Sequence, residues 1–180
     1  DMLKNTLKIL GISISVGLLG FSLCIPLFQS HDMTSISRPY EKTEYTYIAD
    51  PYPPLSGDID FTSLDMDVID EINEVREDMD LDTYDFDEGL GRAAYVRAEE
   101  CEQSVSHTRP DGSKWYTVNQ NICFGENLAY GYDTAEEVVD AWLNSPAHRD
   151  LVYDDEFLTC GIGHFIGSDG TTYIACEFGY

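Results

Sequence analysis

The sequence predicts an α+β fold in which amphipathic helices come first and an antiparallel sheet follows. Apolar residues recur at helical spacing in three stretches, from Leu64, over 87–102 and over 134–143. The end of the chain holds two β-rich runs, 157–166 and 171–178, separated by the turn sequence Gly-Ser-Asp-Gly at 167–170. No internal repeat is visible, so we expect a single domain.

The first two helical stretches begin at Leu64 and run over 87–102. Each has one aligned face, and in the first stretch acidic side chains lie opposite the apolar ones, as in a helix packed on a core. The face is formed by Val68, Ile69, Ile72 and Val75 in the first stretch, and by Leu90, Ala94, Arg97 and Cys101 in the second.

The third helix begins with the best terminal signal. Thr134 followed by Glu137 is a capping-box pattern, and an apolar stripe containing Trp142 follows it. Ser145 and Pro146 then have the residue types of an N-cap and a first helical position. We therefore expect a short fourth helix directly after the third.

The amino-terminal region has the pattern of an export signal. Lys4 and Lys8 precede an uncharged, mostly apolar run over 9–28. About 20 apolar residues also suffice for a membrane-spanning helix. Residues 1–30 are thus predicted to be an uncleaved anchor or a cleaved signal peptide. A third interpretation is that Cys24 is a lipid-modified cysteine. In each reading the acidic remainder lies outside the cell.

Residues 31–63 contain several prolines and tyrosines with no lasting apolar period, which predicts an extended linker. The domain proper is predicted over 64–180. The 180-residue chain has 34 acidic and 10 basic residues, a formal charge of −24. A nucleic-acid partner is therefore not expected, because phosphate contacts need clustered lysine and arginine. The acids are interpreted as a solubilising surface.

Four cysteines follow the linker. Export would place them in an oxidising compartment, where they could form two disulfides in three alternative pairings. The other interpretation is that some are buried thiols. The four are Cys101, Cys123, Cys160 and Cys176.

Three short segments are the candidates for chemistry. They are 106–112, containing His107; 125–129, containing Glu126; and 142–149, containing His148. Spacing alone would leave these residues with structural roles. The three segments in this order, however, resemble the CAP superfamily (cysteine-rich secretory proteins, antigen 5 and pathogenesis-related 1), and HTRPDG, GENLA and WLNSPAHR carry the resemblance.

The resemblance implies a three-layer α-β-α sandwich with a central antiparallel sheet. It also implies a surface cleft with two histidines and two acids that binds a divalent metal in several members, zinc being the expected ion. Carried over by motif, the histidines are His107 and His148 and the first acid is Glu126. The second acid would fall at Ser145, so this cleft is expected to hold one carboxylate. Three roles are open for Glu126: metal ligand, orienter of a histidine, or a purely structural residue that organises the turn.

The loop residues around this cleft are expected to support it. They are Arg109, Asn127, Ser145 and Arg149. The favoured function is an extracellular binding module for a divalent metal, a small molecule, a lipid or a protein partner. The alternative is a metal-assisted, protease-like hydrolase in which His107, Glu126 and His148 act on the substrate. A third possibility is a structural cell-surface spacer.

Overall fold

The computed structural model describes residues 36–38 and 61–180. All of them belong to one compact unit, His31–Tyr180, with its own hydrophobic core. The apolar run at 9–28 and most of the predicted linker lie outside the described residues. No helix within the described ranges is long and apolar enough to span a bilayer.

A five-stranded sheet forms the middle of the unit, in the order β1-β3-β5-β4-β2. The pairs β1–β3, β3–β5 and β5–β4 are antiparallel, whereas the two-residue β2 lies parallel to β4. The predicted antiparallel sheet is thus confirmed except at this edge. The strands are β1 (Ile36–Ser37), β2 (Asp85–Phe86), β3 (Gly125–Tyr130), β4 (Thr159–Ile166) and β5 (Thr172–Gly179).

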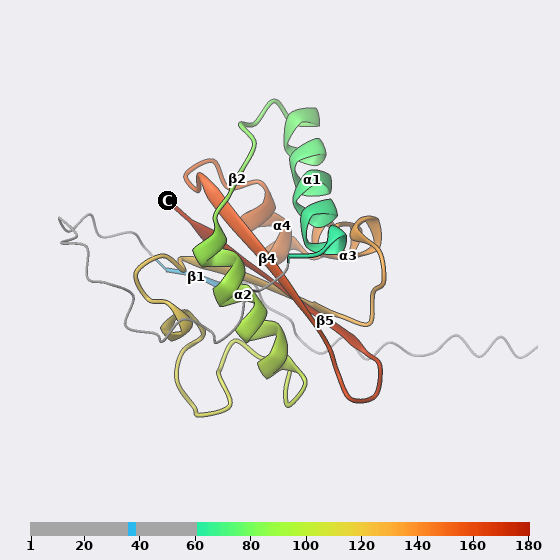
Figure 1. Cartoon of the computed structure of the whole chain (residues 1–180). Coiled ribbons are helices and arrows are strands. Elements are labelled where there is room, and N and C mark those ends of the chain that lie inside the picture. Colours follow the sequence, from blue (N-terminus) through green and yellow to red (C-terminus); the bar gives the residue numbers. More distant parts are fainter. Residues whose placement is uncertain (1–35, 39–60) are drawn as a thin grey trace, which may run out of the picture. The chain divides into compact units, whose positions relative to one another are not determined.

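Helices cover both faces of the sheet, which confirms the three-layer α-β-α architecture (Figure 1). Helix α2 packs on one face, across β4 and β5. On the other face α1 packs against α3 and β4, and α4 lies against β3. The helices are α1 (Ser63–Asp78), α2 (Glu88–Cys101), α3 (Ala135–Leu143) and α4 (Pro146–Val152), with a 3₁₀ turn η1 at Trp115–Val118.

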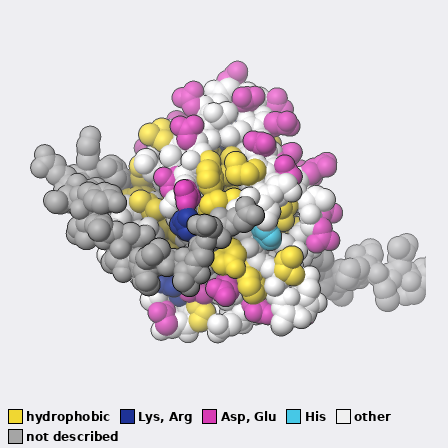
Figure 2. All heavy atoms as spheres, viewed as in Figure 1, with side chains coloured by type: hydrophobic (Ala, Val, Ile, Leu, Met, Phe, Trp, Pro, Cys, Tyr) yellow, Lys and Arg dark blue, Asp and Glu magenta, His cyan; other side chains and the backbone are white. Residues whose placement is uncertain are grey.

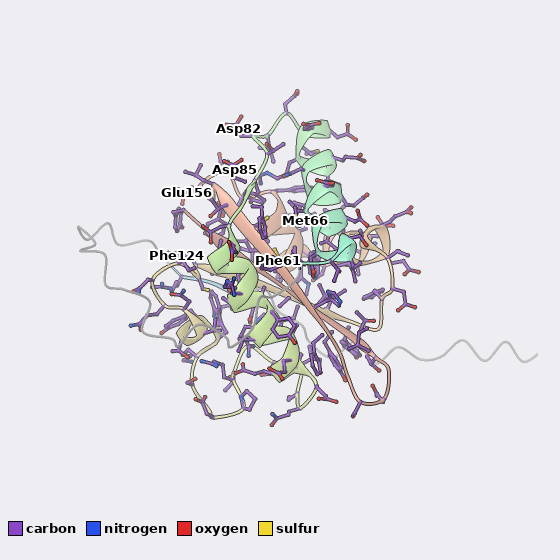
Figure 3. All side chains as sticks on the ribbon, viewed as in Figure 1. Phe61, Met66, Asp82, Asp85, Phe124 and Glu156 are labelled. Atoms are coloured by element: carbon purple, nitrogen blue, oxygen red, sulfur yellow. The ribbon has the colours of Figure 1, made fainter. Side chains whose placement is uncertain are left out.

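The largest core cluster lies between the sheet and the α1, α3 and α4 layer. Even-numbered residues of β4 and β5, such as Ile162 and Cys176, point into it because side chains alternate along a strand. Trp142 of α3 is buried there, and its indole Nε1 donates to Leu128 O at 3.1 Å. The predicted core role of Trp142 agrees with this placement. Figure 3 shows Asp82 and Asp85 on the segment that leads from α1 into β2.

Helix α2 lies unusually close to β4 because two glycines face it. A Cβ on Gly161 would lie 2.1 Å from the backbone nitrogen of Gly91, and one on Gly163 would lie 2.2 Å from that of Tyr95. Any side chain at these positions would push the helix away from the sheet. This close contact fixes the position of α2, and with it the functional side chains that α2 carries.

A short part of the predicted linker forms a strand instead. Ile36 and Ser37 pair with Glu126 and Gly125 at the edge of β3. Arg38 extends this contact: its backbone nitrogen donates to Phe124 O at 2.9 Å and its Nε to Cys123 O at 3.0 Å. The guanidinium lies 4.1 Å from the centre of the Phe124 ring, a cation–π distance.

Two other expectations differ from the structure. All four cysteines of the domain are free, buried thiols, so the expected disulfides are not present. The thiols are spread over three separate core clusters, and only Cys160 and Cys176 share one. Ser145 does occupy the N-cap of α4, but its side chain makes no capping hydrogen bond; its carbonyl accepts from Arg149 N at 2.9 Å.

The contact at Gly163 predicts a large effect of a small substitution. We expect Gly163→Ala to lower the free energy of unfolding by about 3 kcal/mol or more, since the methyl group would overlap the α2 backbone. Denaturant unfolding measures this. Gly112→Ala is the control: nothing lies within 4 Å of its Cβ, and only its φ of 85° opposes the change, at about 1 kcal/mol. Equal losses in the two variants would contradict the close-packing argument.

Candidate functional site

His107 is presented by a tight loop after α2. Gly112 N donates to Arg109 O at 2.8 Å, and Arg109 N to Ser113 O at 3.0 Å. Gly112 has a φ of 85°, which glycine adopts without strain. The predicted turn is therefore present. The carbonyl of His107 accepts from Trp115 N at 3.2 Å, which ties the loop to the buried Trp115.

The side chains of His107, Glu126 and Arg97 form a connected chain. His107 Nδ1 donates to Glu126 Oε1 at 2.5 Å, and Arg97 Nε donates to Glu126 Oε2 at 2.6 Å. Arg97 and Glu126 are essentially fully buried, whereas the side chain of His107 is 14% exposed. Both oxygens of the carboxylate are thus engaged, one by each partner.

Arg97 is held in place by further acceptors. Its Nη2 donates to Ser106 O at 2.6 Å, and its Nη1 pairs with Glu100. Glu100 also binds the guanidinium of Arg109, whose Nη2 lies 2.6 Å from Oε1. Arg97 therefore ties α2 to the loop that carries His107 and to β3, and Arg109 reinforces that loop through Glu100.

The charges at Glu126 favour its ionised form. Burial acts to raise the pKa of this carboxyl, but the hydrogen bond from His107 and the charge of Arg97 outweigh burial and hold the pKa below its usual value. Glu177 of β5 is paired in register with Glu126 and is fully buried. Burial, and next the negative charge of Glu126, raise the pKa of Glu177 well above its ordinary range. Both influences favour the protonated form of Glu177.

His148 approaches from the other side of β3. It lies on α4 with 2% of its surface exposed, and its backbone carbonyl accepts from Asn127 Nδ2 at 3.0 Å. Burial, and next the proximity of His107, lower the pKa of His148 to about 4. Its imidazole is therefore neutral across the physiological range.

The two imidazoles share one unusual property. Nε2 of His107 and Nε2 of His148 are both buried and hydrogen-bond to no described residue. A buried polar atom without a partner is costly, so such atoms are expected to meet water or a ligand. In the described part of the chain no group of three or more His, Cys, Asp or Glu side chains could hold a metal. The protein donors available here are thus two imidazoles, with Glu126 behind one of them.

The structure brings together some of the predicted site residues. His107 and Glu126 are in contact, His107 acts electrostatically on His148, and Asn127 and Arg109 support the two histidine-bearing segments. The side chain of Arg149 makes no hydrogen bond or ion pair with a described residue, and Ser145 contributes only its backbone.

Sequence reasoning missed the roles of Arg97, Glu100 and Glu177. Arg97 had a signal, because it is the one charged residue on the apolar face of its helix and so required a buried partner. No feature of the sequence indicated the role of Glu177, since only the β3–β5 register places it opposite Glu126.

The buried ion pair gives a direct stability prediction. Arg97→Met would leave Glu126 charged and buried without its main partner, so we expect a loss of about 3–5 kcal/mol in the free energy of unfolding. Arg92→Met is the matched control, because Arg92 forms a partly exposed pair with Glu88 on the same helix and should cost less than about 1 kcal/mol. Similar values for both variants would refute the central role of Arg97.

The low pKa of His148 predicts a pH effect. In the unfolded chain this histidine takes up a proton below about pH 6.5, whereas in the folded protein it does so only near pH 4. It therefore reduces stability as the pH falls from 6.5 to 4. We expect denaturant unfolding of His148→Gln to show a shallower loss of stability over this interval than the unsubstituted protein.

His164→Gln is the control for that experiment. The hydrogen bond that His164 donates to Asp65 raises the pKa of this histidine, so its contribution is present at low pH and is lost as the pH rises through the raised value. Removing it should change the pH slope in the opposite sense. Parallel curves for His148→Gln and the unsubstituted protein would contradict the argument.

Known proteins share this fold and its motifs. Residues 69–178 match the CAP family of cysteine-rich secretory proteins. The uncharacterised protein YkwD of Bacillus subtilis (strain 168) is 30% identical over 105 residues, which are 54% of this chain and 40% of that protein. The chain thus spans well under half the length of this curated relative.

Solved structures agree with the family match. An outer surface protein from Borrelia burgdorferi is 25% identical with a TM-score of 0.59, over 67% of this chain and 95% of that one. An extracellular SCP-domain protein from Bacillus anthracis is 20% identical with a TM-score of 0.54, over 63% of this chain and 39% of that one, and shows the common fold. This chain belongs to the CAP superfamily of cysteine-rich secretory proteins.

Proposed function

We propose that this protein is exported, or anchored at the outer face of the membrane, and acts there as a binding module. The basic residues and apolar run at its amino end support export. So do the relatives, which include an outer surface protein and an extracellular protein. The cleft between His107 and His148 is the proposed binding site, for a divalent cation and for a small or lipid ligand that shares it.

The observation that carries this proposal is the pair of buried, unpartnered Nε2 atoms. Zinc binds neutral imidazole nitrogen at about 2.0–2.1 Å and takes four ligands. His107 and His148 would hold the ion, and its remaining positions would be left to water or to a ligand. Two protein donors suit a weak, exchangeable site better than a permanent structural one.

Glu126 has a supporting role in this proposal. Its oxygens accept from His107 Nδ1 and from Arg97, so it orients the imidazole and fixes the proton on Nδ1. That leaves the Nε2 lone pair free to bind a cation. Glu126 is also fully buried and its pKa is held below the usual value, and both features make it a poor general base. We therefore favour binding over the hydrolase alternative.

Zinc titration by calorimetry at pH 7.5 on residues 31–180 tests the site. We expect saturable binding of one ion, weakened at least about tenfold in His107→Gln and in His148→Gln, because each removes one of two donors. His164→Gln is the matched control, since His164 lies in β4, outside the cleft.

Two results would overturn the proposal. Binding that is equally weak in all variants, or that falls in His164→Gln to the same extent, would place zinc elsewhere or nowhere. Circular dichroism of each variant separates a lost donor from a lost fold.

A further inference from the structure

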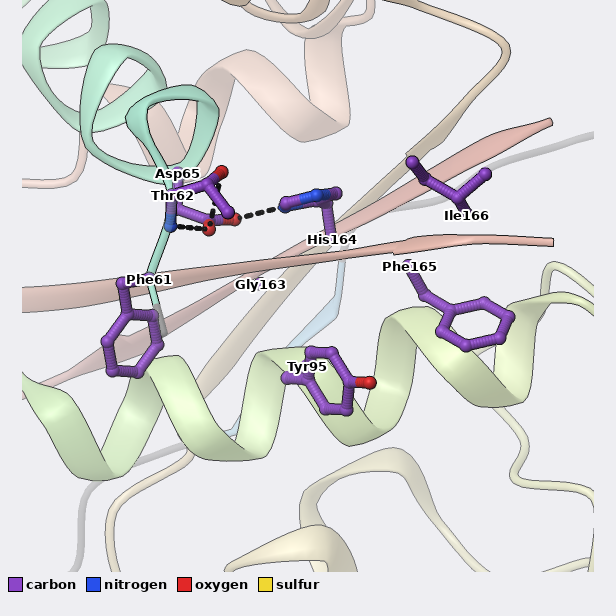
Figure 4. Close-up of a pocket in the computed structure, with 8 residues that line it drawn as sticks. All are labelled: Phe61, Thr62, Asp65, Tyr95, Gly163, His164, Phe165 and Ile166. Atoms are coloured by element: carbon purple, nitrogen blue, oxygen red, sulfur yellow. Dashed lines mark hydrogen bonds and ion pairs between the residues drawn. The ribbon is translucent and has the colours of Figure 1, made fainter. Parts of the chain in front are cut away.

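A pocket lies beside β4, and neither His107 nor His148 lines it (Figure 4). Its volume is about 310 Å³, and its walls come from the start of α1, from α2 and from β4. None of its lining residues contributes to the His107–His148 cleft. The short β2 pairs only with Thr159 and Cys160 of β4, so the pocket lies beyond the end of β2 along this strand.

Aromatic rings make up much of the pocket wall. Phe61, Tyr95 and Phe165 come from three separate segments, and Figure 4 shows them in a row along the α2 side of the strand. Tyr95 and Phe165 meet edge to face with ring centres 6.4 Å apart. Gly163 also lines the pocket and carries no side chain, so that part of the wall stays open.

The polar part of the pocket is a histidine–aspartate pair. His164 Nδ1 donates to Asp65 Oδ1 at 2.8 Å, and Asp65 Oδ2 accepts from Thr62 N at 2.8 Å. The side chain of His164 is 17% exposed, and its Nε2 is neither buried nor hydrogen-bonded to a described residue. Nε2 is therefore open to a molecule in the pocket.

The charge of the pocket restricts its ligand. Asp65 and His164 are the only charge-bearing groups among the eight described residues that line it. With His164 protonated the pair is neutral, and with His164 neutral the pocket carries one negative charge. Asp65 balances the charge of the imidazolium, so the pocket never carries a net positive charge that would attract an anionic ligand.

We propose that this pocket binds a small organic cation with an alkylammonium head. The faces of aromatic rings attract such cations, and three of the eight residues that line the pocket are aromatic. The formal charge of −24 attracts the same ligands over a longer range. Figure 2 shows acidic side chains spread over this face and few basic ones.

Choline chloride is the probe, and 3,3-dimethylbutan-1-ol is its matched control, because it has the same shape without the charge. Protein-detected NMR on residues 31–180 would follow the backbone amides of His164 and Ile166. We expect saturable shifts with choline and binding at least about tenfold weaker for the alcohol.

Tyr95→Leu and Phe165→Leu should each weaken choline binding several-fold. Tyr130→Leu is the control, since Tyr130 stacks on Tyr173 outside this pocket.

The pH dependence gives a second readout. The charged group facing His164 is Asp65 of α1; α2 contributes Tyr95, and β5 places Ile174 opposite. Loss of the His164 proton makes the pocket negative, so choline affinity should rise as the pH rises through the raised pKa of His164. In His164→Gln that rise should be absent.

Three results would overturn the proposal: no choline-dependent shift at millimolar concentration, equal binding of choline and the alcohol, or equal effects of Tyr95→Leu and Tyr130→Leu. Equal binding would identify a merely apolar pocket. If a probe with a carboxylate, such as phenylacetate, bound better than choline, the predicted positive charge of the ligand would be wrong. Because the pocket is separate from the cleft, these outcomes are independent of zinc binding.

Discussion

The buried pair between Arg97 and Glu126 is the interaction on which the candidate cleft depends. It joins α2 to β3, and through Glu126 and the carbonyl of Ser106 it also fixes the loop that carries His107. An ion pair taken out of water is costly unless further hydrogen bonds satisfy it, and here the guanidinium has several acceptors. Burial and the charge of Glu126 raise the pKa of the neighbouring Glu177, which opposes a second negative charge beside Arg97.

The two faces of the sheet position different parts of the candidate site. On one face α2 lies close to β4 over two glycines, and its charged residues build the support behind His107. On the other face the larger core holds α3 and α4, and α4 positions His148. His107 and His148 are positioned by segments packed on opposite faces of the sheet, so they lie near each other only when both layers are in place. Binding at the proposed site would for this reason depend on the integrity of the whole sandwich.

Much of the fold could be predicted from the sequence, because its helices have clear amphipathic faces and its last two strands flank a turn sequence. Strand β3 could not be recognised in this way: it is buried on both faces, so GENLAY shows no alternation. The histidines and Glu126 were found through family motifs, not through spacing. Arg97 had a local signal in its helix, whereas Glu177 depends on strand register, which is a long-range property.

The two edges of the sheet are covered by very short strands, and one of them lies outside the region matched by the family. β1 and Arg38 protect the backbone of β3 next to the cleft. An uncovered strand edge is a template for pairing with another chain and hence for aggregation. Residues 36–38 thus protect this edge of the sheet. A fragment that began at the family boundary would expose this edge and gain a route to self-association.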